Sequence, residues 1–394
     1  MKRFILGLLC ILLSTTVEAV IEYQLSDFMK EETTGGFGYV SIDDKPYFKT
    51  TVNPNFSIKG LQVGLGVTLY IPVAGDDWPT SADWLTIRYL GYDYQKKHGF
   101  KYGRLSKLTL GQGLLVDNFD TGSGGTSEFN NNKTGILGYV SVLKAKLTGL
   151  YTTQKVIGAR AEIPVVELAE TPVIIGATYM KDEDGIQDDG SSGTVINRPE
   201  QDGYAADISY PIGGEFFILY SEYAELIDQG KGISSGARGT FFSVIDYKAE
   251  YRILGTGFVP GYFNNTYQAT GFNFSSGALQ EQVSGVLVNA SSNIMGEYAK
   301  AGLQYELYDD VNVLSAALGW RQIGPVTGVL NYTKPFNTEN DNAILIGSFY
   351  YRTTKFYDLI FKVKRVYITS TEFTESYDVG FVFKLERLIP SLPI

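Results

Sequence analysis

The sequence has 394 residues, a net charge of -10 at pH 7 and a single cysteine, Cys10. This acidic balance argues against nucleic acid, or an anionic membrane surface, as a partner. With 28 tyrosines, 23 phenylalanines, 44 glycines and only 13 prolines, the composition is typical of a β-rich protein, because aromatic residues fit pleated surfaces and glycines fit turns.

The first 19 residues have the pattern of a secretory signal peptide. Two basic residues precede the apolar run Phe4–Leu13, and small residues precede a cleavage site after Ala19. The run is too short to span a membrane as a helix. A lipoprotein signal ending at Cys10 is the minor alternative. Cleavage after Ala19 would leave a net charge of -11 and no cysteine, which excludes disulfides, thiolate metal sites and cysteine nucleophiles.

Residues 20–56 are less regular than the rest of the chain, and three interpretations stay open for them: a periplasmic lead-in, a small plug, or a first pair of strands. From residue 57 to residue 394 the pattern is continuous, which predicts one domain. Its clearest segment is Lys59–Ile71, where six apolar residues alternate with small or polar ones. A period of two residues indicates a strand and is incompatible with a helix.

The same alternation recurs along the whole chain. Further strands are predicted near 84–94, 100–116, 134–143, 145–153, 156–163, 172–181, 204–210, 214–226, 243–253, 298–308, 311–321, 325–334, 343–353, 356–369 and 377–386. At about ten residues each, these strands are long enough to cross a bilayer at a tilt. We therefore predict an all-β fold, a closed antiparallel transmembrane β-barrel of about 16 strands, within a range of roughly 14 to 18.

The predicted connections fall into two kinds. Short turns are expected at 211–214, 309–310 and 324–325, and long polar loops at 117–133, 181–202, 228–236 and 264–293. Long loops at one rim and short turns at the other are typical of a transmembrane barrel.

Alternation alone does not decide which face of the sheet is inside. In a soluble barrel the apolar face lies inside, whereas in a membrane barrel it faces lipid and the polar face lines the lumen. Two features favour the second arrangement. A ring of about 16 strands is too wide for side chains to fill, and aromatic residues expected near strand ends could form girdles at the bilayer surfaces. These residues are Tyr89, Tyr92, Tyr94, Phe349, Tyr350 and Tyr351.

Charged residues fall on the polar parity of the predicted strands and are expected to line the pore. They are Arg160, Glu162, Asp207, Asp246, Lys248, Glu250, Arg252, Lys300, Glu306 and Arg321. Their mixed signs predict cross-strand pairing and a hydrated wall without strong ion selectivity. The alternative is that they solvate the interior of a plugged barrel.

The last predicted strand carries a short motif: a polar residue, a glycine, an aromatic residue and a final hydrophobic residue, at Asp378, Gly380, Phe383 and Leu385. With the signal peptide, the strand period and the loop pattern, this motif resembles the outer-membrane β-barrel family of two-membrane bacteria. The resemblance implies residence in the bacterial outer membrane, contact with its lipid, and recognition by the barrel-assembly machinery. A homotrimer, common among porins, is an open expectation.

The function expected from this resemblance is a porin-like channel for passive diffusion of small polar solutes. Two alternatives stay open: a structural or adhesive surface barrel acting through its long loops, and a transporter of hydrophobic ligands with an N-terminal hatch.

Residues for catalysis or metal binding are sparse, and neither an enzyme nor a cofactor is expected. His98 is the only histidine, which leaves little basis for a catalytic triad or a histidine metal site. Asp182, Asp184 and Asp188 are weak candidates for a hard cation, because they lack the spacing of a calcium-binding loop. The segment Gly255–Phe263 is interpreted first as a strand end with girdle aromatics and second as a loop folded into the lumen.

Overall fold

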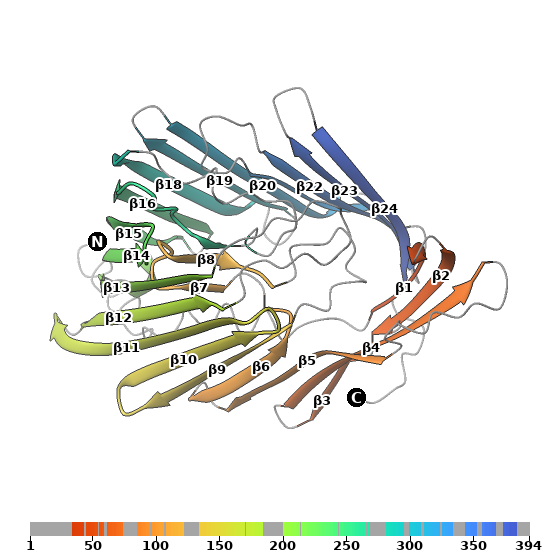
Figure 1. Ribbon diagram of the computed structural model, residues 1–394, viewed down its shortest axis with the longest axis horizontal. Coiled ribbons are helices and arrows are strands. Elements are labelled where there is room, and N and C mark those ends of the chain that lie inside the picture. Colours follow the sequence, from red (N-terminus) through yellow and green to blue (C-terminus); the bar gives the residue numbers. More distant parts are fainter. Residues whose placement is uncertain are drawn as a thin grey trace, which may run out of the picture.

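The computed structural model is almost entirely antiparallel β-sheet (Figure 1). It describes residues 34–42, 45–53, 55–58, 61–73, 85–94, 97–105, 108–121, 134–169, 171–183, 200–212, 214–242, 244–264, 267, 281–294, 299–308, 311–323, 325–333, 343–352, 357–367 and 373–383. Within these residues, no helix has the length and apolar character needed to cross a membrane.

The strands follow one another along the chain with one short helical turn, η1 (Gly214–Phe216). In the first half they are β1 (Thr34–Ile42), β2 (Lys45–Asn53), β3 (Asn55–Ile58), β4 (Leu61–Pro72), β5 (Leu85–Tyr94), β6 (His98–Gly103), β7 (Leu108–Leu110), β8 (Val116–Phe119), β9 (Gly135–Val142), β10 (Ala145–Thr152), β11 (Val156–Leu168) and β12 (Thr171–Asp182). In the second half they are β13 (Gln201–Pro211), β14 (Ile218–Leu226), β15 (Gly230–Phe241), β16 (Ile245–Leu254), β17 (Phe263–Asn264), β18 (Val283–Ile294), β19 (Ala299–Tyr308), β20 (Val311–Ile323), β21 (Val326–Thr333), β22 (Ile344–Arg352), β23 (Tyr357–Tyr367) and β24 (Phe373–Phe383).

The main sheet is built from strands that pair antiparallel with their neighbours in sequence. The exceptions are that β2 pairs with β4 rather than with β3, and that β6 pairs with β9 and β16 with β18, because β7, β8 and β17 lie outside this sheet. At the end of the series, β24 is also hydrogen-bonded to β1, with Gly35 opposite Phe383 and Phe37 opposite Phe381. The pairings therefore return to the strand at which they begin.

The main sheet contains 21 strand segments among the described residues, more than the sequence predicts. One reason is that β2 and β3 are separate segments, which pair with opposite ends of β4. A second reason is that β1, β2 and the first two residues of β3 lie within the range 20–56, for which three interpretations were open. The part of that range that the structure describes forms strands of the same sheet.

The connections between strands differ in length at the two rims of the sheet. Because successive strands are antiparallel, their connections alternate between the rims. The long stretches 73–84, 104–134, 183–200, 255–282 and 334–343 all fall at one rim, here named the long-connection rim. At the other, the short-connection rim, no connection between described strands exceeds six residues. This distribution is the one that the sequence predicts for a transmembrane barrel.

Burial alternates along the strands with a period of two. In β13, Ala205, Asp207 and Ser209 are buried, whereas Tyr204 and Ile208 are exposed. The buried residues lie on the concave face of the sheet, toward which β7 and β8 are placed in Figure 1. The exposed apolar residues lie on the opposite, convex face. The polar parity is thus inside the curve of the sheet and the apolar parity outside, as the membrane-barrel interpretation requires.

Two long connections fold onto the concave face and meet there. Strand β8 pairs antiparallel with β7 and parallel with β17, so residues 104–121 join residues 255–267. We name the described residues of these two segments the internal unit. Its apolar side chains are buried together with concave-face residues of the surrounding strands. This cluster contains Leu105, Leu108, Leu110, Leu114, Leu115, Val116, Phe119, Leu137, Leu150, Val156, Met180, Ala205, Ala224, Leu226, Leu254, Phe258, Tyr262, Phe263, Tyr267 and Tyr308.

The internal unit corrects three expectations. Residues 100–116 are not one strand, because the chain leaves the sheet after Gly103 and turns inward. The start of the predicted loop 117–133 belongs to β8. The segment Gly255–Phe263 is not a strand end with girdle aromatics, since Phe258 and Phe263 are fully buried in the internal cluster. Its apolar residues are satisfied by packing inside the sheet rather than at a bilayer surface.

Parts of two further predicted loops are strands, and one aromatic residue does not lie in a girdle. Residues 230–236 belong to β15, and residues 283–293 belong to β18. Small polar residues occupy the concave face of both strands, so their sequences look like loops although their backbones are paired in the sheet. Tyr89 was expected in a girdle but is buried, and its ring covers the backbone of Gly64.

Candidate functional site

The concave face carries two groups of charged residues that the sequence predicts to line a pore. In the first, Arg160 on β11 binds Asp207 on β13: Nη1 donates to Oδ2 at 2.6 Å and Nη2 to Oδ1 at 3.1 Å. Arg160 Nη2 also donates to Glu162 at 3.0 Å, and Nη1 donates to Thr178 at 2.9 Å. The guanidinium thus links three strands, β11, β12 and β13, across their hydrogen-bonded backbones.

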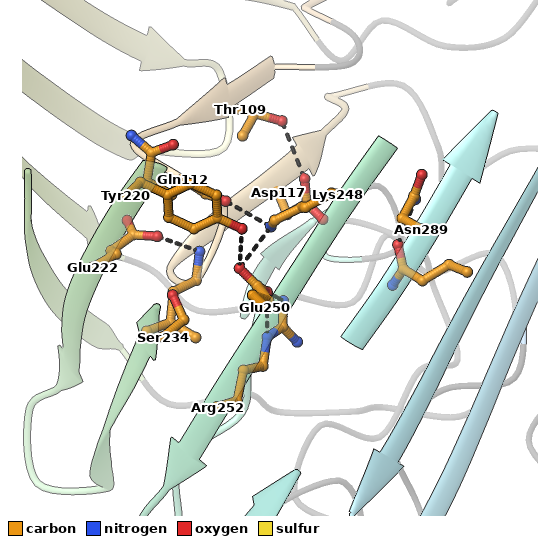
Figure 2. Close-up of polar contacts among 12 residues, drawn as sticks. Thr109, Gln112, Asp117, Tyr220, Glu222, Ser234, Lys248, Glu250, Arg252 and Asn289 are labelled. Carbon is orange, nitrogen blue, oxygen red and sulfur yellow. Dashed lines mark hydrogen bonds and ion pairs between the residues drawn. The ribbon is translucent and has the colours of Figure 1, made fainter. Parts of the chain in front are cut away.

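The second group centres on Arg252 of β16 (Figure 2). Its guanidinium forms an ion pair with Glu250 on the same strand, and Nη1 donates to Glu306 on β19 at 2.9 Å. Glu250 also accepts a hydrogen bond from the hydroxyl of Tyr220 at 2.5 Å, and lies 3.3 Å from Lys248 Nζ. The carboxylates and cations of this group therefore neutralise one another within the sheet.

Glycines in the strands make room for these long side chains to lie flat against the sheet. A Cβ at Gly176 would lie 2.5 Å from Asp207 Oδ2, and one at Gly285 would lie 2.7 Å from the ring of Tyr308. Any larger residue at either position would displace the ion-pair network.

The internal unit is hydrogen-bonded to the same charged residues. The backbone amide of Leu114 donates to Glu222 Oε2 at 2.7 Å, and Gln112 Nε2 donates to Asp207 Oδ1 at 3.1 Å. Lys248 Nζ donates to the carbonyl of Gln112 at 2.7 Å (Figure 2). The turn that makes these contacts has positive φ at Gly111 (75°) and Gly113 (93°), which glycine adopts without strain.

Burial is almost complete for most members of these groups, whereas Glu162 and Lys248 are partly exposed. Asp207 and Arg252 are 4% and 3% exposed, and Glu306 is 7% exposed. A buried charge is costly unless it is paired, and each of these has an oppositely charged partner within 3 Å. The six residues Arg160, Glu162, Asp207, Glu250, Arg252 and Glu306, together with Glu222 and Lys248, are named the buried network. Its geometry is suited to fastening the internal unit to the sheet.

The remaining residues of the predicted pore-lining set lie elsewhere. Asp246 is exposed near the short-connection rim and accepts a hydrogen bond from Thr240 at 2.8 Å. Lys300 is exposed on the same face of β19 as Glu306. Arg321 belongs to β20, but its side chain lies outside the described residues. Pore lining stays a prediction for the whole set.

The candidates for metal binding and catalysis are dispersed. Asp182 is buried and accepts a hydrogen bond from Tyr267 at 2.5 Å, so it fastens the internal unit. Asp184 and Asp188 lie outside the described residues. Within the described part of the chain, no group of histidine and carboxylate residues has the arrangement of a metal site. His98 is exposed and stacks on Tyr94, with 5.0 Å between ring centroids.

Of the predicted assembly signal, Asp378, Gly380 and Phe383 lie on β24, the strand that pairs with β1. Leu385 lies outside the described residues.

The sequence interpretation missed the residues that connect the internal unit to the sheet. Tyr220 and Glu222 alternate with outward-facing residues in the segment 218–226, so their parity could have placed them on the concave face. Gln112 carries no such signal. It lies on a turn between two glycines, and the sequence predicts this segment as part of a strand.

Comparisons with known proteins give structural likenesses only. No protein-family model matches the sequence, and no curated protein does. A triple mutant of the Rhodopseudomonas blastica porin is similar at a TM-score of 0.31 and 11% identity, over 89% of this chain and 98% of that chain. The outer membrane protein OpdK of Pseudomonas aeruginosa is similar at a TM-score of 0.36 and 10% identity, over 89% of this chain and 96% of that chain. A structure of OpdK with vanillate has the same TM-score and identity.

Proposed function

We propose that this protein is a channel of the bacterial outer membrane: a closed β-barrel through which small polar solutes diffuse passively. The observation that supports it best is the division of the sheet into an apolar convex face and a polar concave face. Both faces belong to one sheet whose last strand pairs with its first.

The convex face is unsuited to water. Large apolar residues are exposed along it, including Ile163 (47%), Ile208 (47%) and Leu303 (54%). Every strand of the main sheet from β9 to β23 exposes at least one large apolar residue, so the exposed apolar surface extends around much of the sheet. A soluble monomer rarely exposes such a surface. Contact with lipid explains it, because the apolar residues of a membrane barrel face outward.

Tyrosines on the convex face lie toward both ends of the strands. Tyr179 and Tyr204, near the long-connection rim, donate to the carboxylates of Asp202 and Glu225. Tyr210 and Tyr247, near the short-connection rim, donate to backbone carbonyls of Leu168 and Phe216. Each ring is thus placed with a polar tip beside an apolar body, the arrangement of aromatic girdles at membrane surfaces.

The size of the sheet favours a channel over a solid barrel. With 21 strand segments in one sheet, a closed ring would be wider than side chains alone can fill. The polar concave face would then border water, through which a polar solute could pass.

The N-terminal residues bear on the alternative of a transporter with a hatch. The described residues between 34 and 56, within the range considered for a plug, belong to strands that pair with β4 or with each other. A surface protein that acts only through its loops stays the second alternative, and conductance separates it from a channel.

The test uses the purified full chain in planar lipid bilayers. The channel is supported if the protein inserts and gives stepwise ion conductance, and if liposomes containing it swell in isotonic solutions of small sugars. A protein that inserts but passes neither ions nor sugars contradicts the proposal. Unboiled and boiled samples should also migrate differently in SDS gels, and carbonate washing should leave the protein in the membrane.

The motif on β24 is proposed as the signal read by the barrel-assembly machinery. Phe383→Ala should lower the amount of folded protein in the outer membrane, whereas Tyr377→Ala, on the same strand outside the motif, should lower it less. Equal loss in both variants would count against the motif.

A further inference from the structure

The internal unit covers only part of the concave face. Its side-chain hydrogen bonds to the sheet reach residues of β12, β13, β14 and β16, and the buried network extends to β19 through Glu306. On β19, β20 and β21, by contrast, the concave face holds exposed side chains at Lys300, Ala317 and Asn331. The two parts of the concave face are therefore different surfaces, one closed by packing and one open.

Beside Lys300, the open part carries a run of uncharged residues that strand register makes continuous. Asn289 of β18 lies opposite Gln304 of β19, and Gln304 lies opposite Ser315 of β20. Two residues further along each strand, on the same face, Ser291 lies opposite Gly302, and Gly302 lies opposite Ala317. Ala317 in turn lies opposite Asn331 of β21. These residues, named the neutral wall, are Asn289, Ser291, Gly302, Gln304, Ser315, Ala317 and Asn331.

The side chains of the neutral wall are amides, hydroxyls and small groups. Asn289 donates to Gln304 Oε1 at 3.0 Å, and Gln304 Nε2 donates to Glu306 at 2.8 Å. The second amide proton of Asn289 can still donate to another partner. Amides and hydroxyls donate and accept hydrogen bonds without net charge. Such a surface replaces water around a neutral polar solute without attracting either sign of ion.

We propose that the solute path of the channel runs along the neutral wall and selects neutral polar solutes such as small polyols over ions. The buried network fastens the internal unit and does not contact the solute. This inference rests on the proposed channel function and adds the location and chemistry of its path.

Substituted cysteines test the path, because the sequence contains no cysteine other than Cys10. Ala317→Cys and Asn331→Cys place thiols on the neutral wall. Ser234→Cys places a nearly isosteric thiol on the concave face within the covered part, where Ser234 is 1% exposed. Each variant and the parent chain would be inserted into planar bilayers and treated with a membrane-impermeant anionic thiosulfonate, with labelling measured by mass spectrometry.

The expected result is that the reagent labels Ala317→Cys and Asn331→Cys, lowers their conductance and shifts their reversal potential in a KCl gradient toward cation preference. Ser234→Cys and the parent should keep their conductance. Labelling of Ser234→Cys with a change in its conductance, and no change in the other two, would overturn the path. A parent chain that conducts no ions would overturn the channel itself, a different outcome.

Solute preference is the second arm of the same experiment. In liposome swelling, the parent should admit a neutral pentitol faster than gluconate or lysine, which are of comparable size and carry opposite charges. Equal rates for the three solutes, or a preference for either ion, would contradict the proposed selectivity while leaving the channel function intact.

Discussion

The backbone amide of Leu114 donates a hydrogen bond of 2.7 Å to the carboxylate of Glu222, which is 1% exposed. Leu114 belongs to the internal unit and Glu222 to the sheet, and 108 residues of chain separate them. The contact therefore holds the turn of the internal unit against the concave face of the sheet.

Glu222→Ala should loosen the internal unit. The substitution leaves the amide of Leu114 buried without an acceptor, which costs about 1 to 3 kcal/mol. Urea unfolding in detergent micelles measures the loss. Glu222→Gln keeps an oxygen acceptor in place and is the matched control, expected to lose less. Equal stability of Glu222→Ala and the parent would show that the contact does not hold the turn.

Arg252→Met should be more damaging, because it leaves Glu306 buried without its cation and Glu250 with Lys248 alone. Removing one partner of a buried ion pair typically costs about 3 to 5 kcal/mol. The temperature at which the folded form is lost in unboiled SDS gels gives the comparison. Lys300→Met, on the same face but exposed, should stay within about 0.5 kcal/mol of the parent. Similar losses in both variants would contradict burial as the cause.

A charge at the convex face should be costly and one at the open concave face should not. Ala249 is exposed on the convex parity of β16, and Ala317 is exposed on the concave face of β20. Ala249→Arg should cost about 2 to 4 kcal/mol if the residue lies near the bilayer midplane. Ala317→Arg meets water and should cost much less. Refolding yield into lipid vesicles in urea provides the measurement. A larger loss for Ala317→Arg than for Ala249→Arg would mean that the concave face, and not the convex face, meets lipid.

Gly64→Ala should strain the sheet, because the new Cβ would overlap the ring of Tyr89 on the neighbouring strand β5, whose nearest ring atoms include Cζ at 2.9 Å. Overpacking of this kind costs about 1 to 3 kcal/mol. Gly138→Ala is the control, since the closest atom to its Cβ would be 3.8 Å away. If adding Tyr89→Ala recovers the stability lost in Gly64→Ala, the overlap with the ring is the cause of the loss. If the double variant stays unstable, glycine is needed at residue 64 for its backbone conformation.

Much of the main sheet could be predicted from the sequence, because a strand with one apolar face and one polar face must alternate. The segment 243–253 illustrates this: Glu250 and Arg252 were expected inside, and both are buried on the concave face. Strand β15 escaped prediction for the opposite reason. Gly232, Ser234 and Gly236 occupy its concave parity, and such residues are as common in loops.

The internal unit could not be foreseen from alternation. Leu114 and Leu115 are adjacent and both fully buried, since the unit packs its apolar side chains all around rather than on one face. Its contacts to Asp207 and Glu222 join segments about a hundred residues apart. The alternation in the sequence shows which charged residues lie on the sheet, but not that the carboxylate of Glu222 accepts a hydrogen bond from the backbone amide of Leu114.

The pairing of β1 with β24 has a consequence for how the chain folds. It joins Phe37 to Phe381, the largest sequence separation among the strand pairs of the described sheet. Contacts between distant segments form late, because the chain must lose the entropy of the whole intervening loop before they are gained. Until β24 pairs with β1, the growing sheet has two edges whose backbone groups lack a strand partner. We therefore expect this pairing to form last, and the two edges to be open to pairing with other chains until it does.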